Sequence, residues 1–201
     1  CERGQGTMTT VMSLDLVTMR YTTLAPMITA RDRHATAVLD GKLFVMGGYN
    51  RPVGGYLSSV ECLDLETGQR SAMAPMITPR SHHGAAVLGR KIYVAGGSPV
   101  TTVGTLVESF DAATNQWTAV APMNTPRVNH GVVSAQGKLF AVGGFNVQNR
   151  ALSSVECFDP STRVWSNIAA LSTVRDQPAV AVLGDKPVSY THLTLPTRCL
   201  G

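Results

Sequence analysis

Residues 107–144, VESFDAATNQWTAVAPMNTPRVNHGVVSAQGKLFAVGG, contain the features that decide the fold of this chain. The stretch predicts four short strands: an alternating one over 107–111, a second opened by Trp117, a third after His130 and a fourth that closes on a diglycine. A polar turn joins the first two strands, and a proline-containing connection joins the second to the third. We therefore expect one antiparallel four-stranded unit.

The rest of the chain repeats this unit. An aspartate, an arginine and a diglycine each recur at intervals of 47 to 49 residues. A repeat of this length made of four short strands is typical of a β-propeller blade. The repeated positions are Asp15, Asp64, Asp111 and Asp159; Arg31, Arg80, Arg127 and Arg175; and Gly47-Gly48, Gly96-Gly97 and Gly143-Gly144.

Several marks in fixed register give the unit a family resemblance. A Val-Glu precedes the aspartate, and a tryptophan follows it. An Ala-Pro-Met comes after the second strand, and the diglycine ends the fourth. The unit resembles the Kelch repeat, and most closely the propellers of BTB-Kelch proteins. The resemblance covers about residues 10–186 and implies an all-β, Kelch-type β-propeller of about four blades. Each blade would have four antiparallel strands, and the ring would be incomplete, since the family usually closes with six.

The expected domain organisation follows the repeat. Residues 1–9 match nothing and form a ragged start. The units span about 11–59, 60–106, 107–154 and a truncated 155–186. From Val188 to Thr197 the sequence resembles a translated sequencing adapter, so we expect residues 187–201 to be a non-native tail and exclude them from the repeat.

Composition narrows the function class. The chain has 201 residues, 44% hydrophobic content and a formal net charge of +4, with no basic run or basic-aromatic stripe. These values favour a globular domain with a solvated surface over a nucleic-acid groove. No apolar stretch approaches the ~20 residues of a membrane helix. The four cysteines lack zinc spacing, and Cys62 and Cys157 fall two units apart, too far for a disulfide. We expect free thiols and a cytoplasmic protein, with cytoskeletal association as the alternative.

Two positions depart from the repeat. Met12 stands where the other units have Glu61, Glu108 and Glu156. The aromatic position reads Tyr21, Arg70, Trp117 and Trp165, so Arg70 replaces a buried tryptophan. Truncating a buried tryptophan typically costs ~3–5 kcal/mol. Arg70 must therefore be compensated locally, or its blade is weakly packed.

The repeated glycines and charges are expected to be architectural. A diglycine at the end of a strand is predicted to allow close backbone approach between adjacent blades and a positive φ. It lacks the spacing of a phosphate-binding loop. By resemblance, the repeated Glu and Arg belong to inter-blade polar packing, and Glu61, Glu108 and Glu156 are candidate partners of the arginines.

A recognition surface is expected on one face. In an antiparallel meander, the connections between blades and the loops after the diglycines emerge on the same side, and these loops differ between units while the strands do not. The position two after the repeated arginine carries Arg33, His82, Asn129 and Gln177, predicted to ring the channel mouth; in BTB-Kelch propellers the matching positions line the substrate pocket. The predicted outer wall is Tyr49, Asn50, Arg51, Tyr56, Ser98, Phe145, Asn146, Gln148 and Arg150. Arg33 and Arg51 would suit an acidic peptide.

Other chemistries lack a pattern. His82 and His83 are neighbours that would point to opposite sides of a strand, so we expect no metal site. No nucleophile has a base and an orienting group at motif spacing. A Kelch-fold oxidase would need His, Tyr and Cys ligands that nothing in the sequence places together. We expect no catalytic residues and no cofactor.

The resemblance implies a protein–protein interaction module that recognises substrates for a cullin-RING ubiquitin ligase. The cullin would be bound only through a BTB domain, which this sequence does not contain. An actin-binding or cytoskeletal scaffold is the first alternative, and a Kelch-fold oxidase the second. The expected partner is a protein or peptide, and neither nucleic acid nor membrane.

Overall fold

The computed structural model describes residues 9–148, 150–184 and 186–190. Three four-stranded antiparallel sheets form the body, each a meander in chain order from the inner strand outward. The first blade contains β3 (Ala35–Leu39), β4 (Lys42–Met46), β7 (Val60–Asp64) and β8 (Arg70–Met73). The second contains β9 (Gly84–Leu88), β10 (Lys91–Ala95), β11 (Val107–Asp111) and β12 (Gln116–Val120). The third contains β13 (Gly131–Ala135), β14 (Lys138–Val142), β17 (Val155–Asp159) and β18 (Val164–Ile168).

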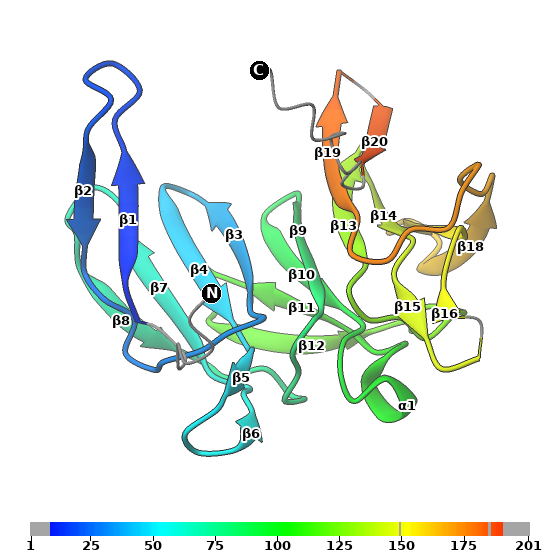
Figure 1. Cartoon of the computed structure of the whole chain (residues 1–201), viewed down its shortest axis with the longest axis horizontal. Helices are drawn as coiled ribbons and strands as arrows, with labels where there is room; N and C mark the ends of the chain where they lie inside the picture. Colours follow the sequence, from blue (N-terminus) through cyan, green and yellow to red (C-terminus); the bar gives the residue numbers. More distant parts are fainter. Residues whose placement is uncertain (1–8, 149, 185, 191–201) are drawn as a thin grey trace, which may run out of the picture.

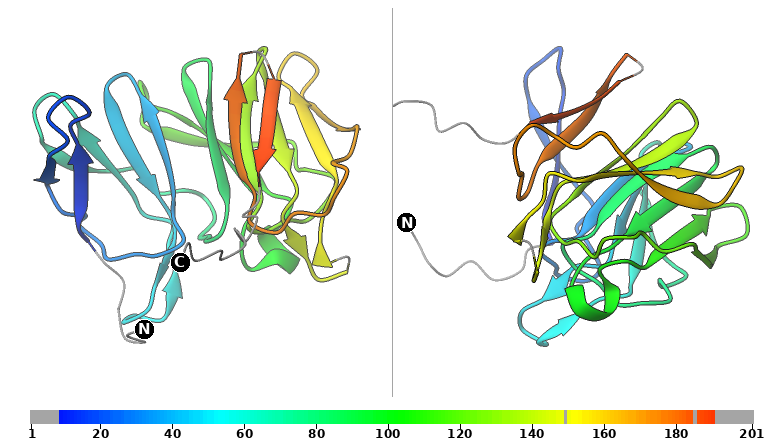
Figure 2. Two further views of the ribbon diagram at one scale, coloured as in Figure 1. Left: turned by 45° about the horizontal axis from the view of Figure 1, so that its top comes forward. Right: turned by 90° about the vertical axis from the view of Figure 1, so that its right-hand side faces the viewer.

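Two half-blades lie at the ends of this arc (Figures 1 and 2). The first pairs β1 (Val11–Leu14) with β2 (Tyr21–Leu24), and the last pairs β19 (Ala179–Leu183) with β20 (Lys186–Tyr190). The all-β propeller fold is thus confirmed. Each sequence unit straddles two blades, because it begins with the outer strands of one and ends with the inner strands of the next.

The strand pairing extends into the expected non-native tail. Residues 187–190 continue β20, in which Pro187 pairs with Val182 and Val188 with Ala181. A segment with the alternating pattern Val-x-Tyr can form backbone hydrogen bonds with one edge of β19. Pro187 is tolerated because it lies near the start of the strand. Residues 191–201, like residues 1–8 at the other end, lie outside the described residues.

The core lies between the blades. Phe44 meets Phe110 edge-on with ring centroids 5.8 Å apart, and Tyr93 meets Phe158 at 6.3 Å in the next interface. Trp117 and Trp165 cover Phe110 and Phe158 from the outer strand, at 5.0 and 5.2 Å. The same aromatic arrangement therefore repeats at successive interfaces, as the sequence repeat requires.

The diglycines bring neighbouring blades into backbone contact, as predicted. Gly96 and Gly97 have φ values of +62° and +110°. A Cβ on Gly96 would lie 2.6 Å from the carbonyl oxygen of Arg127 in the next blade, and the Gly97 N–H donates to that same oxygen at 3.0 Å. Gly48 and Gly144 donate in the same way to Arg80 and Arg175. Side chains at these positions would separate the blades.

The repeated arginines and glutamates form buried pairs. Arg31 contacts Glu61 at 2.6 Å and Arg127 contacts Glu156 at 2.8 Å, while Arg80 pairs with Glu108. Each glutamate also accepts two backbone N–H groups from the connection that enters its blade, such as Ile28 and Thr29 for Glu61. The pair thereby fixes the blade-to-blade connection onto the sheet that follows. Since each of these buried charges is paired with an opposite charge, its burial is tolerated.

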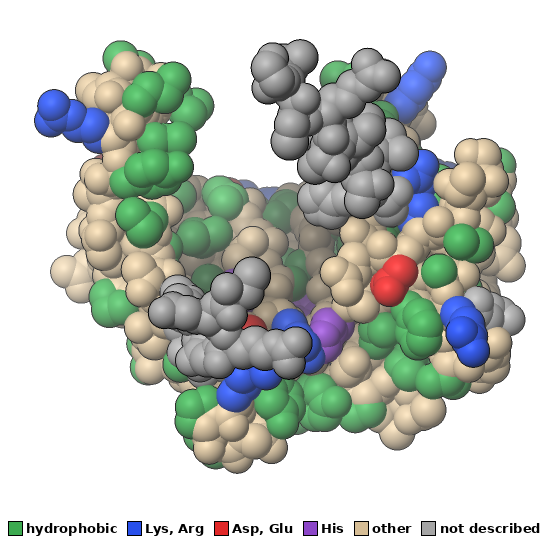
Figure 3. Space-filling view, in the orientation of Figure 1, with side chains coloured by type: hydrophobic (Ala, Val, Ile, Leu, Met, Phe, Trp, Pro, Cys, Tyr) green, Lys and Arg blue, Asp and Glu red, His purple; other side chains and the backbone are tan. Residues whose placement is uncertain are grey.

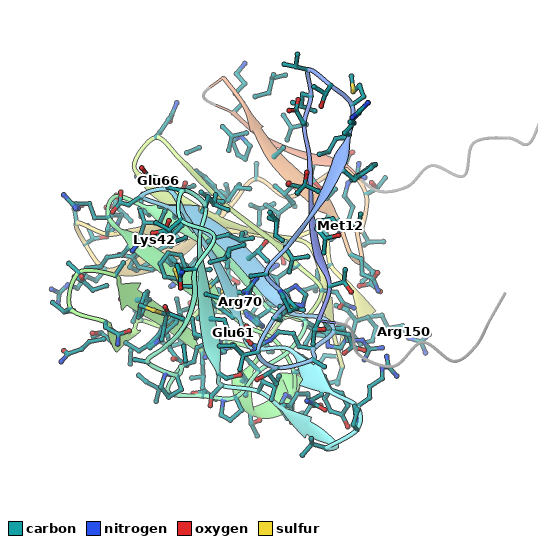
Figure 4. All side chains as sticks on the ribbon, turned by 90° about the vertical axis from the view of Figure 1, so that its left-hand side faces the viewer. Met12, Lys42, Glu61, Glu66, Arg70 and Arg150 are labelled. Atoms are coloured by element: carbon teal, nitrogen blue, oxygen red, sulfur yellow. The ribbon has the colours of Figure 1, made fainter. Side chains whose placement is uncertain are left out.

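Arg70 is compensated by the hydrogen bond that tryptophan makes elsewhere. The indole Nε1 of Trp117 donates to the Ala74 carbonyl and that of Trp165 to Ala121, both in the preceding Ala-Pro-Met. Arg70 donates through Nε and Nη2 to Ala25, the equivalent alanine, and its Nη1 lies 3.5 Å from Glu61 (Figure 4). The first blade therefore keeps the hydrogen bond from this position to the alanine carbonyl of the preceding connection, but it loses the stacking of a tryptophan ring.

Candidate functional site

The variable loops emerge together on one face, as the sequence analysis expected. They include β5 (Tyr49–Asn50) with β6 (Gly55–Tyr56), α1 (Val100–Val103), and β15 (Phe145–Asn146) with β16 (Arg150–Ala151). Backbone bridges join these loops to the blade connections: Asp32 to Tyr49, Ser81 to Ser98 and Val128 to Phe145. In Figure 1 this face points downward, opposite the tight turns of β3–β4 and β9–β10. We call it the loop face.

A pocket of about 480 Å³ opens at the centre of the loop face. The space-filling view shows a hollow inside the arc, with histidine and basic side chains at its lower end (Figure 3). The four predicted mouth residues all line this pocket. Three histidines and a proline, which follow them in the sequence, form the rest of its lining. The eight lining residues are Arg33, His34, His82, His83, Asn129, His130, Gln177 and Pro178.

The four mouth residues share one backbone conformation. Their φ values lie between 52° and 55°, in the left-handed region that non-glycine residues rarely adopt. The His82 N–H donates to the Arg33 carbonyl, and the Asn129 N–H donates to the His82 carbonyl, both at 2.9 Å. Backbone hydrogen bonds thus connect successive blades around the mouth without any contribution from the side chains. The side chains at these positions can therefore differ without altering the frame.

The histidines beneath the mouth were not predicted as site residues. His34, His83 and His130 each stand three residues after a repeated arginine, and of these only His130 was used above, to mark the start of a strand. Burial is the main cause that lowers their pKa values, and the neighbouring arginines Arg31, Arg80 and Arg127 lower them further. The pKa of His130 falls to about 3, and that of His83 lies well below its usual range. These imidazoles are neutral at neutral pH.

His82 differs from the deeper histidines in its exposure and its partners. Its Nδ1 lies 2.8 Å from the hydroxyl of Ser81, which is fully buried. Partial burial lowers the His82 pKa, Arg33 lowers it further, and Asp32 and Asp176 oppose the shift. The Ser81 contact holds the orientation of the imidazole ring. The position of the other ring nitrogen, Nε2, is therefore also fixed.

The aromatic and basic part of the predicted outer wall is present. Tyr49 and Tyr56 pack edge-to-face on the β5–β6 ribbon with centroids 5.4 Å apart. Arg51 contacts the carboxylate of Asp32 at 2.6 Å. The expectation that Arg51 reads an acidic peptide must therefore take into account an acidic group that it already holds.

Two predicted wall residues are buried instead. Asn50 and Asn146 are 8% and 2% exposed. Asn50 accepts the Val53 N–H through its side-chain oxygen, and so folds the tip of the ribbon. Because this Asx-type bond uses the side chain inside the loop, Asn50 shapes the wall and does not present it.

The remaining wall residues lie at different depths. Ser98 exchanges backbone hydrogen bonds with Ser81, and Phe145 is half-buried against Val128. Gln148 and Arg150 are exposed on the β15–β16 ribbon, where Figure 4 shows Arg150 projecting outward. In the second blade α1 takes the place of a ribbon. The wall is consequently uneven around the pocket.

A second cavity, of about 430 Å³, opens on the opposite face between the first and second blades. Phe44, Cys62 and Met73 form its apolar side, and burial raises the pKa of the Cys62 thiol. Charged residues of its rim are paired within the fold: Lys42 with Asp64, Arg90 with Asp40 and Asp111 with Lys91. The loop-face pocket is the better candidate site because its polar side chains are less engaged.

Within the described part of the chain, no cluster of three or more His, Cys, Asp or Glu could hold a metal ion. Cys62 and Cys157 are free thiols, while Cys1 and Cys199 lie outside the described residues. The described residues also include no helix with the length and apolar character that crossing a bilayer requires.

Comparison with known families agrees with this architecture. Residues 2–188 match the family model described as the KLHDC2/KLHL20/DRC7 Kelch-repeats domain. The chain belongs to this Kelch family. A Kelch-repeat domain is generally a protein-binding module, and the varied loop face of this one is the surface on which such binding can occur. No match was found among curated proteins.

Proposed function

We propose that this Kelch domain binds a segment of a substrate protein at the loop face, catalyses no reaction itself, and serves as the recognition module of a cullin-RING ubiquitin ligase in the cytoplasm. The observation that carries the proposal is the mouth of the pocket. Four different polar side chains occupy equivalent positions on one backbone conformation, so their variety is not required by the frame. Variation on a fixed scaffold is the usual arrangement of a recognition surface.

The surroundings of the mouth support protein recognition. The Tyr49–Tyr56 pair offers rigid aromatic area beside the pocket, and tyrosine and arginine are enriched among interface anchors. Arg33 makes no ion pair with the described residues, and its guanidinium is thus available to a carboxylate. A polar pocket flanked by aromatic residues suits an extended peptide with at least one acidic group.

The test compares two variants of the protein. The mouth variant carries Arg33→Ala, His82→Ala and Gln177→Ala; the control carries Arg90→Ala on the opposite face. Affinity capture coupled to quantitative mass spectrometry should recover one or more proteins with the wild type and the control, and lose them with the mouth variant. In cells whose own copy of the gene carries the mouth substitutions, ubiquitination of the captured proteins should then fall.

Equal capture by the mouth variant would contradict binding at this site. Capture without ubiquitination would leave a Kelch interaction module and remove the ligase role. Cosedimentation with F-actin that needs the same residues would favour the cytoskeletal alternative.

A further inference from the structure

Basic nitrogen groups line the central pocket, and none of its lining residues among those the structure describes carries a carboxylate. Among its eight lining residues are one guanidinium, from Arg33, and four imidazoles. Both ring nitrogens of His83, which is 7% exposed, have no hydrogen-bond partner among the described residues. A buried polar group without a partner is costly, so the pocket floor favours a ligand that can hydrogen-bond to it.

Positively charged arginines lie behind the pocket, but the pocket lining itself carries little charge at neutral pH. Arg31, Arg80 and Arg127 lie behind the histidines, and their presence disfavours protonation of the imidazoles. At neutral pH Arg33 is therefore the one cation among the described residues that line the pocket. An anion that enters would reverse the balance, because an opposite charge within about 4–6 Å favours the charged form of an imidazole.

We propose that this pocket is a subsite for an acidic group of the bound segment, and that the group binds together with a proton taken up by His82. Arg33 supplies the standing charge, His82 supplies the induced one, and the neutral floor at His83 accepts or donates a further hydrogen bond. This inference rests on the proposed function, because it assigns the central contact of the same face.

A protonated His82 needs a negative group nearby, and the carboxylates around it are already engaged by other residues, so the ligand must supply that group. Of the two carboxylates near His82, Asp32 is held by Arg51, and Asp176 accepts a hydrogen bond from Asn129 at 3.3 Å. No carboxylate is among the groups that act on His83. The charged and titratable groups that face His82 are Arg33, Asp32 and Asp176, beside the Ser81 hydroxyl; those that face His83 are Arg80, His34, His82 and His130.

The direction of the pH effect follows from linkage. The ligand's acidic group raises the pKa of His82 in the complex above its value in the free protein. Between these two values the complex holds one more proton than the separate partners, so affinity rises as the pH falls. For one proton the gain is at most about tenfold per pH unit.

The experiment uses the full chain with ¹³C-labelled histidine and two capped peptides, Gly-Gly-Glu-Gly-Gly and Gly-Gly-Gln-Gly-Gly. NMR titrations across about pH 5 to 7.5 follow each imidazole and the peptide affinity together. We expect the Glu peptide to raise the pKa of His82 and to bind more tightly as the pH falls. The Gln peptide should do neither.

The chain itself supplies the matched variants. Gln177 and Arg33 occupy the position of His82 in other units with φ values of 52° and 55°, so His82→Gln and His82→Arg suit the backbone. His82→Gln should bind the Glu peptide weakly with a flat pH profile. His82→Arg should bind it more tightly than His82→Gln at every pH, also with a flat profile. Arg90→Gln, on the opposite face, should keep the wild-type pH dependence.

The outcomes separate the two ideas. A Glu peptide that binds with no pH dependence, or whose pH dependence survives His82→Gln, overturns the proton uptake and leaves the recognition function intact. A Glu peptide that shifts no pocket resonance at any pH overturns the acidic subsite. Protein binding at the loop face, by contrast, fails if the mouth variant captures the same proteins as the wild type.

Discussion

The repeated arginines act in two directions at once. The guanidinium of Arg80 donates to the carbonyl groups of Gly96 and Leu106 and pairs with Glu108, all in its own blade. Its backbone carbonyl accepts the Gly48 N–H at 2.8 Å from the blade before. Arg80 thus stabilises the strands of its own blade through its side chain and the contact with the preceding blade through its backbone. This double role explains why arginine recurs in every unit.

The buried histidines beside these arginines make the fold sensitive to acid. Folded His130 has a pKa of about 3 and that of His83 is also strongly lowered, whereas an unfolded histidine titrates near 6.5. Below about pH 6.5 the unfolded chain therefore binds protons that the folded chain does not. Stability should fall with decreasing pH, by up to about 1.4 kcal/mol per pH unit for each histidine. Urea unfolding at several pH values between about 7 and 5 measures the slope.

The matched variant for this prediction is His130→Gln, which cannot take up a proton. It should lower stability at neutral pH but reduce the slope by about one proton. A slope that is unchanged in the variant, or a wild type whose stability is constant over this range, would contradict the assignment.

At the scale of elements, each diglycine combines a strained turn with a close contact. Two glycines at the ends of β10 separate these effects, because Gly89 and Gly96 have φ values of +61° and +62°. A Cβ on Gly89 would meet nothing within 4 Å, whereas one on Gly96 would lie 2.6 Å from the Arg127 carbonyl.

Gly89→Ala should therefore cost only the conformational strain, about 1–2 kcal/mol. Gly96→Ala should cost that amount and about 1–3 kcal/mol more, because the blades must shift to relieve the contact. Denaturant unfolding of the two variants gives the difference directly. Equal costs would mean that the blades are not held in contact by this glycine.

The strands and their pairing could be predicted from the sequence, since a period of about 48 residues with fixed glycines and alternating apolar positions allows few alternatives. The same repeat located the four mouth residues. The loops could not be predicted to this depth: whether Asn50 faces a partner or its own turn depends on loop geometry that no repeat encodes. The role of Arg70 also escaped prediction, because its hydrogen bond to Ala25 becomes visible only when two blades are seen side by side.

At the scale of the whole molecule, the two half-blades leave β1 and β20 without a second neighbour. Each pairs with one described strand, whereas the equivalent strands of the first full blade, β7 and β4, each pair with two. The β1–β2 hairpin also exposes large apolar side chains, including Val17 at 93%. Figure 3 shows hydrophobic side chains gathered over this hairpin at the upper left. Unpaired edges and exposed apolar surface of this kind promote association between chains.

We therefore expect this chain to self-associate as its concentration rises. Met12→Lys with Leu14→Lys places charges along β1 and should shift sedimentation toward the monomer, because lysine on an edge opposes strand pairing. Val17→Lys, at the tip of the hairpin, changes the net charge less and leaves the strand itself intact, so its effect should be smaller. A wild type that stays monomeric at high concentration would contradict the prediction.

The shared backbone of the four mouth positions has a consequence for how binding preferences can change over time. Since Arg, His, Asn and Gln are all accommodated at φ values within a few degrees of one another, each position can be exchanged without a compensating change elsewhere. Selection, natural or in the laboratory, can thus explore new combinations one substitution at a time. A combinatorial library confined to these four codons would retarget the domain while its folding remained that of the parent.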